Sequence, residues 1–271
     1  MRVFVSADME GISSVAGWSD VTPGSLDYQQ ACHWVTQDVN AAIQGALEAG
    51  AETILVNDGH WYQRNIIPDE LDVHAELIRG YTKPLGMMEG IDRHWDAAFF
   101  VGYHTRLGIR DGLMGHTLSD KCFRDVRLNG HPVSEAELNA AIAGEFSVPV
   151  VMISGDSALE REVKTFLPGV PTVVVKTSLE YETTVLLHPT VARQRIVEAA
   201  RLGLERASAI APYRIKTPCL VEAEFQNVEA ATLASSVPTV SRVDDSTVRF
   251  EAEDMATAMR VLKVFLKLGS S

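Results

Sequence analysis

The opening stretch RVFVSADME spans residues 2–10 and places a short β-rich run directly before two acidic residues. After a loop, apolar residues recur at helical spacing from Ser25 to Ala49, with Ser25 as the expected N-cap and Gly50 as the C-cap glycine. Thr53–Val56 is then a second short strand. This order, in which the strands hardly alternate between polar and apolar residues, predicts a parallel sheet covered by helices.

The same succession of strands and helices continues along the chain. Polar and apolar residues alternate from Cys122 to Val133 around Asn129-Gly130, a dipeptide favoured in two-residue turns, and predict a β-hairpin. The expected fold class is α/β, with a mostly parallel sheet flanked by helices. Its further strands are expected at Ala97–Tyr103, Val148–Ser154 and Thr172–Lys176, and its helices at Glu135–Phe146, Ser157–Phe166 and Pro189–Ala207.

The composition shifts at Ala211-Pro212 and again at Thr217-Pro218. We therefore expect two parts: an α/β catalytic domain over residues 1–210 that carries the functional site, and a smaller C-terminal α+β subdomain over residues 211–271. The second part has expected strands at Cys219–Phe225 and Ser246–Glu251 and expected helices at Val228–Ser235 and Met255–Leu268.

The composition also excludes several classes of protein. Asp and Glu outnumber Lys and Arg by 36 to 24, so the chain repels phosphate backbones and nucleic acid is not an expected partner. No apolar run approaches the ~18 residues of a membrane span, and the few apolar residues before Asp8 are too short for a secretory signal. Three scattered cysteines suggest neither disulfides nor a thiolate zinc site. We expect a cytoplasmic protein without membrane contact.

Potential metal ligands follow three strands of the expected sheet. Asp8 and Glu10 come after the first strand, and residues two apart in an extended segment project to the same side. The second strand leads to His60 and the third to His104. Because ligands bind outside the carboxyl ends of strands in open parallel sheets, we expect these side chains to converge. The alternatives are solvated loop acids and hydrogen-bonded structural histidines.

One more histidine and one of two glutamates complete the candidate set. His116 lies twelve residues after His104 in a glycine-bearing loop that can turn it back to the same edge; the alternative is a loop histidine without a task. Glu135 and Glu137 begin the helix capped by Ser134, where acids favour the helix dipole in any case. Since residues two apart do not share a helix face, at most one of them points at the site.

Carboxylate and imidazole ligands without a thiolate suit zinc, with manganese or cobalt as substitutes. Asp8, Glu10 and one glutamate bring more negative charge than a single dication normally collects in a catalytic site. Two ions about 3.5 to 4 Å apart, bridged by a carboxylate, would balance that charge. The ligand set therefore predicts two metal ions per chain.

Five motifs carry these residues: ADMEGI at 7–12, VNDGH at 56–60, GYH at 102–104, MGH at 114–116, and PVSE at 132–135 with LNA at 138–140. In order and spacing they resemble the zinc D-aminopeptidases of the bacterial dipeptide-transport operon. The resemblance runs from the first strand to the C-terminal helix and so covers nearly the whole chain. Each motif is weak alone, but five in register are strong.

The resemblance implies a dinuclear zinc site and selects Glu135 over Glu137. It also implies a homo-oligomer, since members of the family form a decameric ring that encloses the active sites. Two departures lie near the catalytic position: Gly115 replaces a serine, and the loop after His104 is one residue longer. By matching positions, the resemblance implies that Asp8 binds both zinc ions, Glu10 and His60 one of them, His104 and Glu135 the other, and that His116 is catalytic.

The sequence thus predicts a dinuclear zinc aminopeptidase that releases the N-terminal residue of short peptides, with the preference for D-alanyl peptides implied by the resemblance. Alternatives are an L-specific aminopeptidase or dipeptidase of the same fold, a dinuclear phosphoesterase that uses Arg106 and Arg110, and a non-catalytic metal-binding sensor or scaffold. Three roles are open for His116: stabiliser of the oxyanion, proton shuttle and nucleophile.

Overall fold

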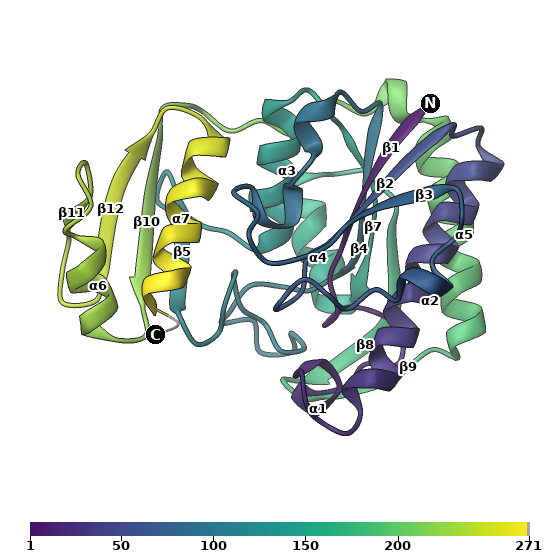
Figure 1. The fold of residues 1–271 in the computed structure, drawn as a ribbon, viewed down its shortest axis with the longest axis horizontal. Coiled ribbons are helices and arrows are strands. Elements are labelled where there is room, and N and C mark those ends of the chain that lie inside the picture. Colours follow the sequence, from purple (N-terminus) through teal and green to yellow (C-terminus); the bar gives the residue numbers. More distant parts are fainter. Residues whose placement is uncertain (270–271) are drawn as a thin grey trace.

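The computed structural model describes residues 1–269, and its larger part is a seven-stranded sheet (Figure 1). Six strands are parallel, and only the edge strand β9 runs antiparallel to its neighbour, so the predicted α/β class with a mostly parallel sheet is confirmed. The strands in spatial order are β3 (Ala75–Ile78), β2 (Thr53–Asp58), β1 (Arg2–Ala7), β4 (Ala97–Tyr103), β7 (Val150–Asp156), β8 (Thr172–Glu180) and β9 (Thr183–Leu186).

The central strands are buried on both faces, which explains why their sequences hardly alternate. Val3 and Val5 of β1 belong to one core, which α2 (Tyr28–Glu48) and α5 (Pro189–Glu205) cover. Phe4, between them in sequence, points to the opposite core. That core is shared with α3 (Glu135–Glu145) and α4 (Ser157–Phe166), on the other side of the sheet (Figure 1).

A second, five-stranded sheet lies beyond α3 and α4 (Figure 1). It combines strands from two separate parts of the chain, because the predicted hairpin around Asn129-Gly130 forms and β5 pairs with β10. The division of the chain at residue 210 stays a prediction. In spatial order the strands are β11 (Ser241–Arg242), β12 (Thr247–Ala252), β10 (Cys219–Phe225), β5 (Phe123–Leu128) and β6 (His131–Pro132), with helices α6 (Val228–Ala234) and α7 (Met255–Gly269).

The first long helix begins later than the sequence predicts. Its N-cap is Asp27, whereas Ser25 Oγ donates a hydrogen bond to the Thr22 carbonyl at 2.8 Å and closes a turn after the short helix α1 (Trp18–Val21). Short 3₁₀ segments lie at Pro68–Glu70, Gly86–Met88, Ile91–Arg93 and Ala207–Ala209. No helix in residues 1–269 has both the length and the apolar character needed to cross a bilayer.

Candidate metal centre and active site

The carboxyl ends of three neighbouring strands deliver most of the candidate residues. Strands β2, β1 and β4 are adjacent in the large sheet. Asp8 and Glu10 follow β1, His60 follows β2, and His104 follows β4 directly. The structure brings all four side chains together and buries them, as the order of the strands predicts.

The loop after β1 is held tightly against its neighbours. Gly11 approaches β4 so closely that a Cβ atom there would lie 1.8 Å from the carbonyl oxygen of Tyr103. From the other side, Lys176 of β8 is fully buried and its Nζ donates to the carbonyls of Glu10, at 2.5 Å, and Val15, at 2.7 Å. These contacts fix the path of the loop and thereby the position of the Glu10 side chain.

Asp8 lies at the centre of the cluster, with one carboxylate oxygen toward each of two groups of residues. Its Oδ1 is 3.3 Å from His60 Nδ1, and the same nitrogen is 3.0 Å from Glu10 Oε2. Its Oδ2 is 3.5 Å from His104 Nε2, which in turn is 3.7 Å from Glu135 Oε1. Each group has its ligand atoms within 4.8 Å of one another, close enough to surround a metal ion.

The two acids at the start of α3 point to different places, as their spacing predicts. Ser134 caps the helix by accepting a hydrogen bond from the Glu137 backbone N–H. Glu135 faces the cluster, and its Oε1 accepts a hydrogen bond from the Leu118 N–H at 2.6 Å. Glu137 is buried elsewhere, where its Oε1 accepts a hydrogen bond from the Tyr213 hydroxyl at 2.8 Å.

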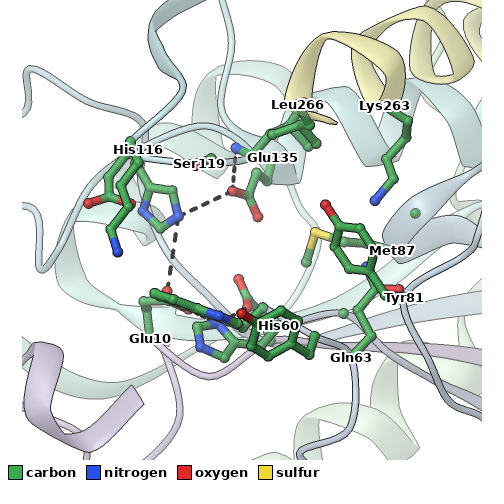
Figure 2. A pocket seen from close by; sticks show the side chains of 18 of the residues that line it. Glu10, His60, Gln63, Tyr81, Met87, His116, Ser119, Glu135, Lys263 and Leu266 are labelled. Carbon is green, nitrogen blue, oxygen red and sulfur yellow. Dashed lines mark hydrogen bonds and ion pairs between the residues drawn. The ribbon is translucent and has the colours of Figure 1, made fainter. Parts of the chain in front are cut away.

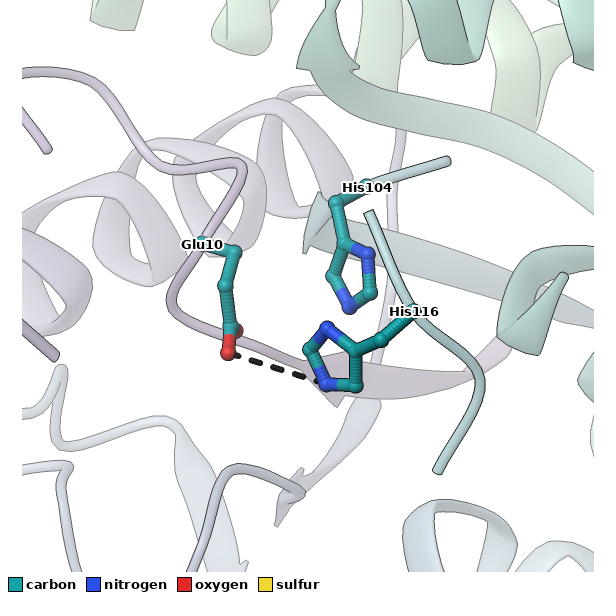
Figure 3. Close-up of side chains that lie close together, drawn as sticks. All are labelled: Glu10, His104 and His116. Atoms are coloured by element: carbon teal, nitrogen blue, oxygen red, sulfur yellow. Dashed lines mark ion pairs between the residues drawn. The ribbon is translucent and has the colours of Figure 1, made fainter. Parts of the chain in front are cut away.

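The loop after β4 turns back and returns His116 to the cluster (Figure 3). The His116 N–H donates to the Thr105 carbonyl at 3.2 Å, and its ring stacks on that of His104 with centroids 4.3 Å apart. His116 Nε2 lies 3.7 Å from Glu135 Oε1 and 4.0 Å from Glu10 Oε1. Together with Glu10 and His104, it forms a third group whose ligand atoms lie within 4.8 Å.

Each of the three histidines of the cluster has one ring nitrogen at hydrogen-bond distance from a backbone carbonyl and the other facing the carboxylates. His60 Nε2 lies 2.8 Å from the Val21 carbonyl oxygen, and His104 Nδ1 lies 2.9 Å from that of Thr105. His116 Nδ1 lies 2.8 Å from the Met114 carbonyl oxygen. A carbonyl oxygen can only accept a hydrogen bond, so the ring nitrogen beside it carries the proton. Each of these bonds therefore fixes the tautomer and leaves the inward nitrogen free to bind a metal.

The charges and unpaired atoms of the cluster fit a bound cation. Asp8 Oδ2, Glu10 Oε2 and His104 Nε2 are buried without a hydrogen-bond partner, which is costly unless another group contacts them. Burial raises the pKa of Glu135 to about 8; His104 opposes this shift, and the charges of Asp8 and Glu10 add to it. A divalent cation would satisfy the unpaired atoms and keep the carboxylates ionised.

A cavity of about 450 Å³ opens above the cluster (Figure 2). Asp8, Glu10, His60, His116 and Glu135 form its acidic and imidazole side. Its other walls come from distant parts of the chain that the sequence analysis did not select, because nothing in their local sequence marks them. They include Trp18, Trp61, Gln63, Tyr81, Lys121 and Lys263, the last from helix α7.

Arg106 and Arg110 do not contribute to this cavity. Arg106 bonds the neighbouring Leu107 carbonyl, and Arg110 is largely exposed and pairs with Glu180. No arginine is among the described residues that line the cavity. The two arginines that favoured a phosphoesterase in the sequence are therefore not part of the cavity.

Comparisons with known proteins show the family of the chain. The family model for peptidase family M55, D-aminopeptidase, matches residues 1–264. The chain belongs to the D-aminopeptidase family. The chain is 32% identical over 270 residues to the D-aminopeptidase of Bacillus subtilis strain 168, an alignment that covers 99% of this chain and 98% of the relative.

A solved structure gives the same result in three dimensions. It is the zinc-dependent D-aminopeptidase DppA from Bacillus subtilis, described as a self-compartmentalizing protease. The superposition has a TM-score of 0.95 at 31% sequence identity and covers 100% of this chain and 98% of the other. The chain therefore has the fold of this peptide hydrolase along its whole length.

Proposed function

We propose that the chain is a dinuclear zinc aminopeptidase. Asp8 would bind both zinc ions, with Glu10 and His60 on one and His104 and Glu135 on the other. The observation that carries the proposal is the position of Asp8, whose two carboxylate oxygens face the two separate groups of ligands. The zinc dependence of the Bacillus subtilis relative supports the choice of metal, for which manganese or cobalt could substitute.

Zinc held there would act as a Lewis acid on the peptide carbonyl and would supply a water of lowered pKa. The protein groups position the substrate and move protons. His116 exposes Nε2 to the cavity while its Nδ1 is held by the Met114 carbonyl, so it can transfer a proton to the departing amine. Beside it, Trp18 lies with its ring centroid 5.7 Å away and forms part of the cavity wall.

The substrates we propose are short peptides with a free N-terminus and a D-residue there, D-alanyl peptides among them. The small cavity supports a short substrate. Membership of the D-aminopeptidase family supports the D configuration. Selectivity for L-peptides on the same fold is the alternative.

We also propose that the chain works as a large homo-oligomer in the cytoplasm, in a decameric ring. The self-compartmentalizing relative supports an assembly, and the three buried, unpaired cysteines suit a reducing compartment. Light scattering gives the test, because a mass near 29.6 kDa would contradict any oligomer. Fractionation of cells that produce the protein tests its location.

A panel of matched peptides tests the activity. Metal-loaded protein should cleave D-Ala-D-Ala faster than L-Ala-L-Ala and should leave the N-acetylated forms intact. Equal cleavage of acetylated peptides would exclude an aminopeptidase, and faster cleavage of the L-peptide would overturn the D assignment. An aryl phosphate in the same assay should be stable; its hydrolysis in place of the peptides would support a phosphoesterase.

A further inference from the structure

The cavity above the cluster is lined both by the expected metal ligands and by a lysine. Asp8, Glu10 and Glu135 are among the lining ligands, and Lys263 lines the cavity from helix α7. Figure 2 shows Lys263 and Tyr81 across the cavity from His116. A short peptide that is cleaved at the cluster has a carboxylate at its far end, which a lysine in the same cavity is suited to bind.

Lys263 is held in place by its aliphatic stem and by an aromatic ring. Its ammonium nitrogen lies 4.5 Å from the centroid of the Tyr81 ring. The stem packs along Gly86, where an added Cβ atom would lie 3.6 Å from Lys263 Cδ. Such packing leaves the charged end fewer conformations, so less entropy is lost when it binds a ligand.

The ammonium group of Lys263 has no acidic partner among residues 1–269. None of the ion pairs in this part of the chain includes it, and Tyr81 is its charge-stabilising contact. Glu89 is near enough to favour the charged form, yet burial dominates and lowers the pKa of Lys263. A half-buried cation without a carboxylate partner, on the wall of a cavity, is suited to bind an anionic ligand.

We propose that Lys263 binds the C-terminal carboxylate of the substrate, so that the enzyme prefers short peptides with both ends free. This inference rests on the proposed aminopeptidase function and adds a requirement at the far end of the peptide. An extended dipeptide spans roughly 7 Å, and a cavity of about 450 Å³ is at the small end of ligand pockets. The cavity therefore suits a short peptide that lies between the cluster and Lys263.

The test compares D-Ala-D-Ala with its C-terminal amide, which differs only in the charge at that end. The wild-type enzyme should cleave the free acid with a kcat/KM about 10- to 100-fold higher, the effect of one charge-assisted hydrogen bond. In Lys263→Met this preference should fall close to one. For the free acid, the Lys263→Met variant should have a higher KM and an unchanged kcat, because the contact is present in both the ground and the transition state.

Other variants separate charge from folding. Lys263→Arg should keep most of the preference, and Lys263→Gln should lose it while preserving much of the stem. Lys164→Met removes a lysine of α4 that pairs with Glu160, and it should retain the wild-type preference. Unchanged cleavage of the amide by the Lys263 variants shows that their catalytic centre is intact.

Two outcomes would overturn this inference and leave the proposed function intact. One is equal cleavage of acid and amide by the wild type, and the other is a preference for the acid that survives in Lys263→Met and Lys263→Gln. A preference lost in Lys121→Met but kept in Lys263→Met would likewise contradict it and would move the contact to the other lysine beside the cavity. Failure of metal-loaded protein to cleave either peptide would overturn the proposed function itself.

Discussion

His104 and His116 stack with their rings at 19° to each other, and each has its Nδ1 against a backbone carbonyl. The two imidazoles are therefore oriented alike, yet we assign them different tasks. His104 Nε2 is directed at Asp8, the residue placed between the two metal positions. His116 Nε2 has only the longer contacts with Glu10 and Glu135 and lies on the cavity wall.

His116→Ala should therefore keep the fold and both metal ions and should lower kcat by about 10²- to 10⁴-fold, the usual contribution of a general acid or base. Elemental analysis and steady-state kinetics on the same preparation measure both effects. Because Glu10, His104 and His116 also form a group of metal-ligand size, a variant with one zinc ion fewer would make His116 a ligand. An unchanged kcat would make it a bystander.

Protein purified without chelator and reconstituted with zinc should contain two ions per chain. The reason is the charge of three buried carboxylates, which one dication does not balance. Chelator should abolish activity, and added zinc should restore it. A stoichiometry that stays at one after reconstitution would contradict the dinuclear site.

Glu135→Gln should remove most activity and reduce the zinc content, whereas Glu137→Gln should keep both. The two side chains are equally buried and two residues apart, so they form a matched pair. Glu137 contacts Tyr213 and His131, away from the ligands, and its amide can still accept the hydrogen bond from the Tyr213 hydroxyl. Its replacement should cost about 1 kcal/mol of stability or less. Loss of zinc in Glu137→Gln would show that the ligand has been misassigned.

Lys83 should make the stability of the protein depend on pH. Its buried Nζ donates to Asn57 Oδ1 at 2.5 Å and to the Asp58 carbonyl at 2.7 Å, and burial lowers its pKa from 10.5 to about 8. Between these two values the unfolded chain binds the proton more strongly, so this group makes the free energy of unfolding rise with pH. Below pH 8 its contribution is constant.

Urea unfolding of wild type and Lys83→Met at pH 8 and pH 10 measures this effect. The methionine variant should be less stable at both values, because buried oxygen atoms lose their donor. The deficit should grow by up to a few kcal/mol toward pH 10, as expected for a shift of this size. A deficit that shrinks toward pH 10 would contradict the lowered pKa.

The sequence was sufficient for the parts of the fold that repeat a local pattern. The apolar runs of β1, β2 and β4 end where the candidate ligands begin, so the convergence of Asp8, Glu10, His60 and His104 follows from the parallel order of the strands. The hairpin is also local, since Asn129 and Gly130 both adopt the positive φ that its turn requires.

Features that depend on distant contacts could not be predicted in this way. Ser25 has the chemistry of an N-cap but forms a turn with Thr22 instead. The Val21 carbonyl orients the His60 ring from a distant part of the sequence, while the nearby Asp58 accepts a hydrogen bond from the Ile66 backbone N–H. These partners become visible only when segments far apart in the sequence are packed together.

The pairing of β5 with β10 and the packing of α7 against α3 affect the order in which the cavity is assembled during synthesis of the chain. During translation the acidic cluster is supplied by early residues, whereas α7, which carries Lys263, leaves the ribosome long afterwards. Until that helix docks, the cavity lacks the wall that carries Lys263. The complete cavity therefore forms only after the last helix of the chain has packed against the domain that holds the ligands.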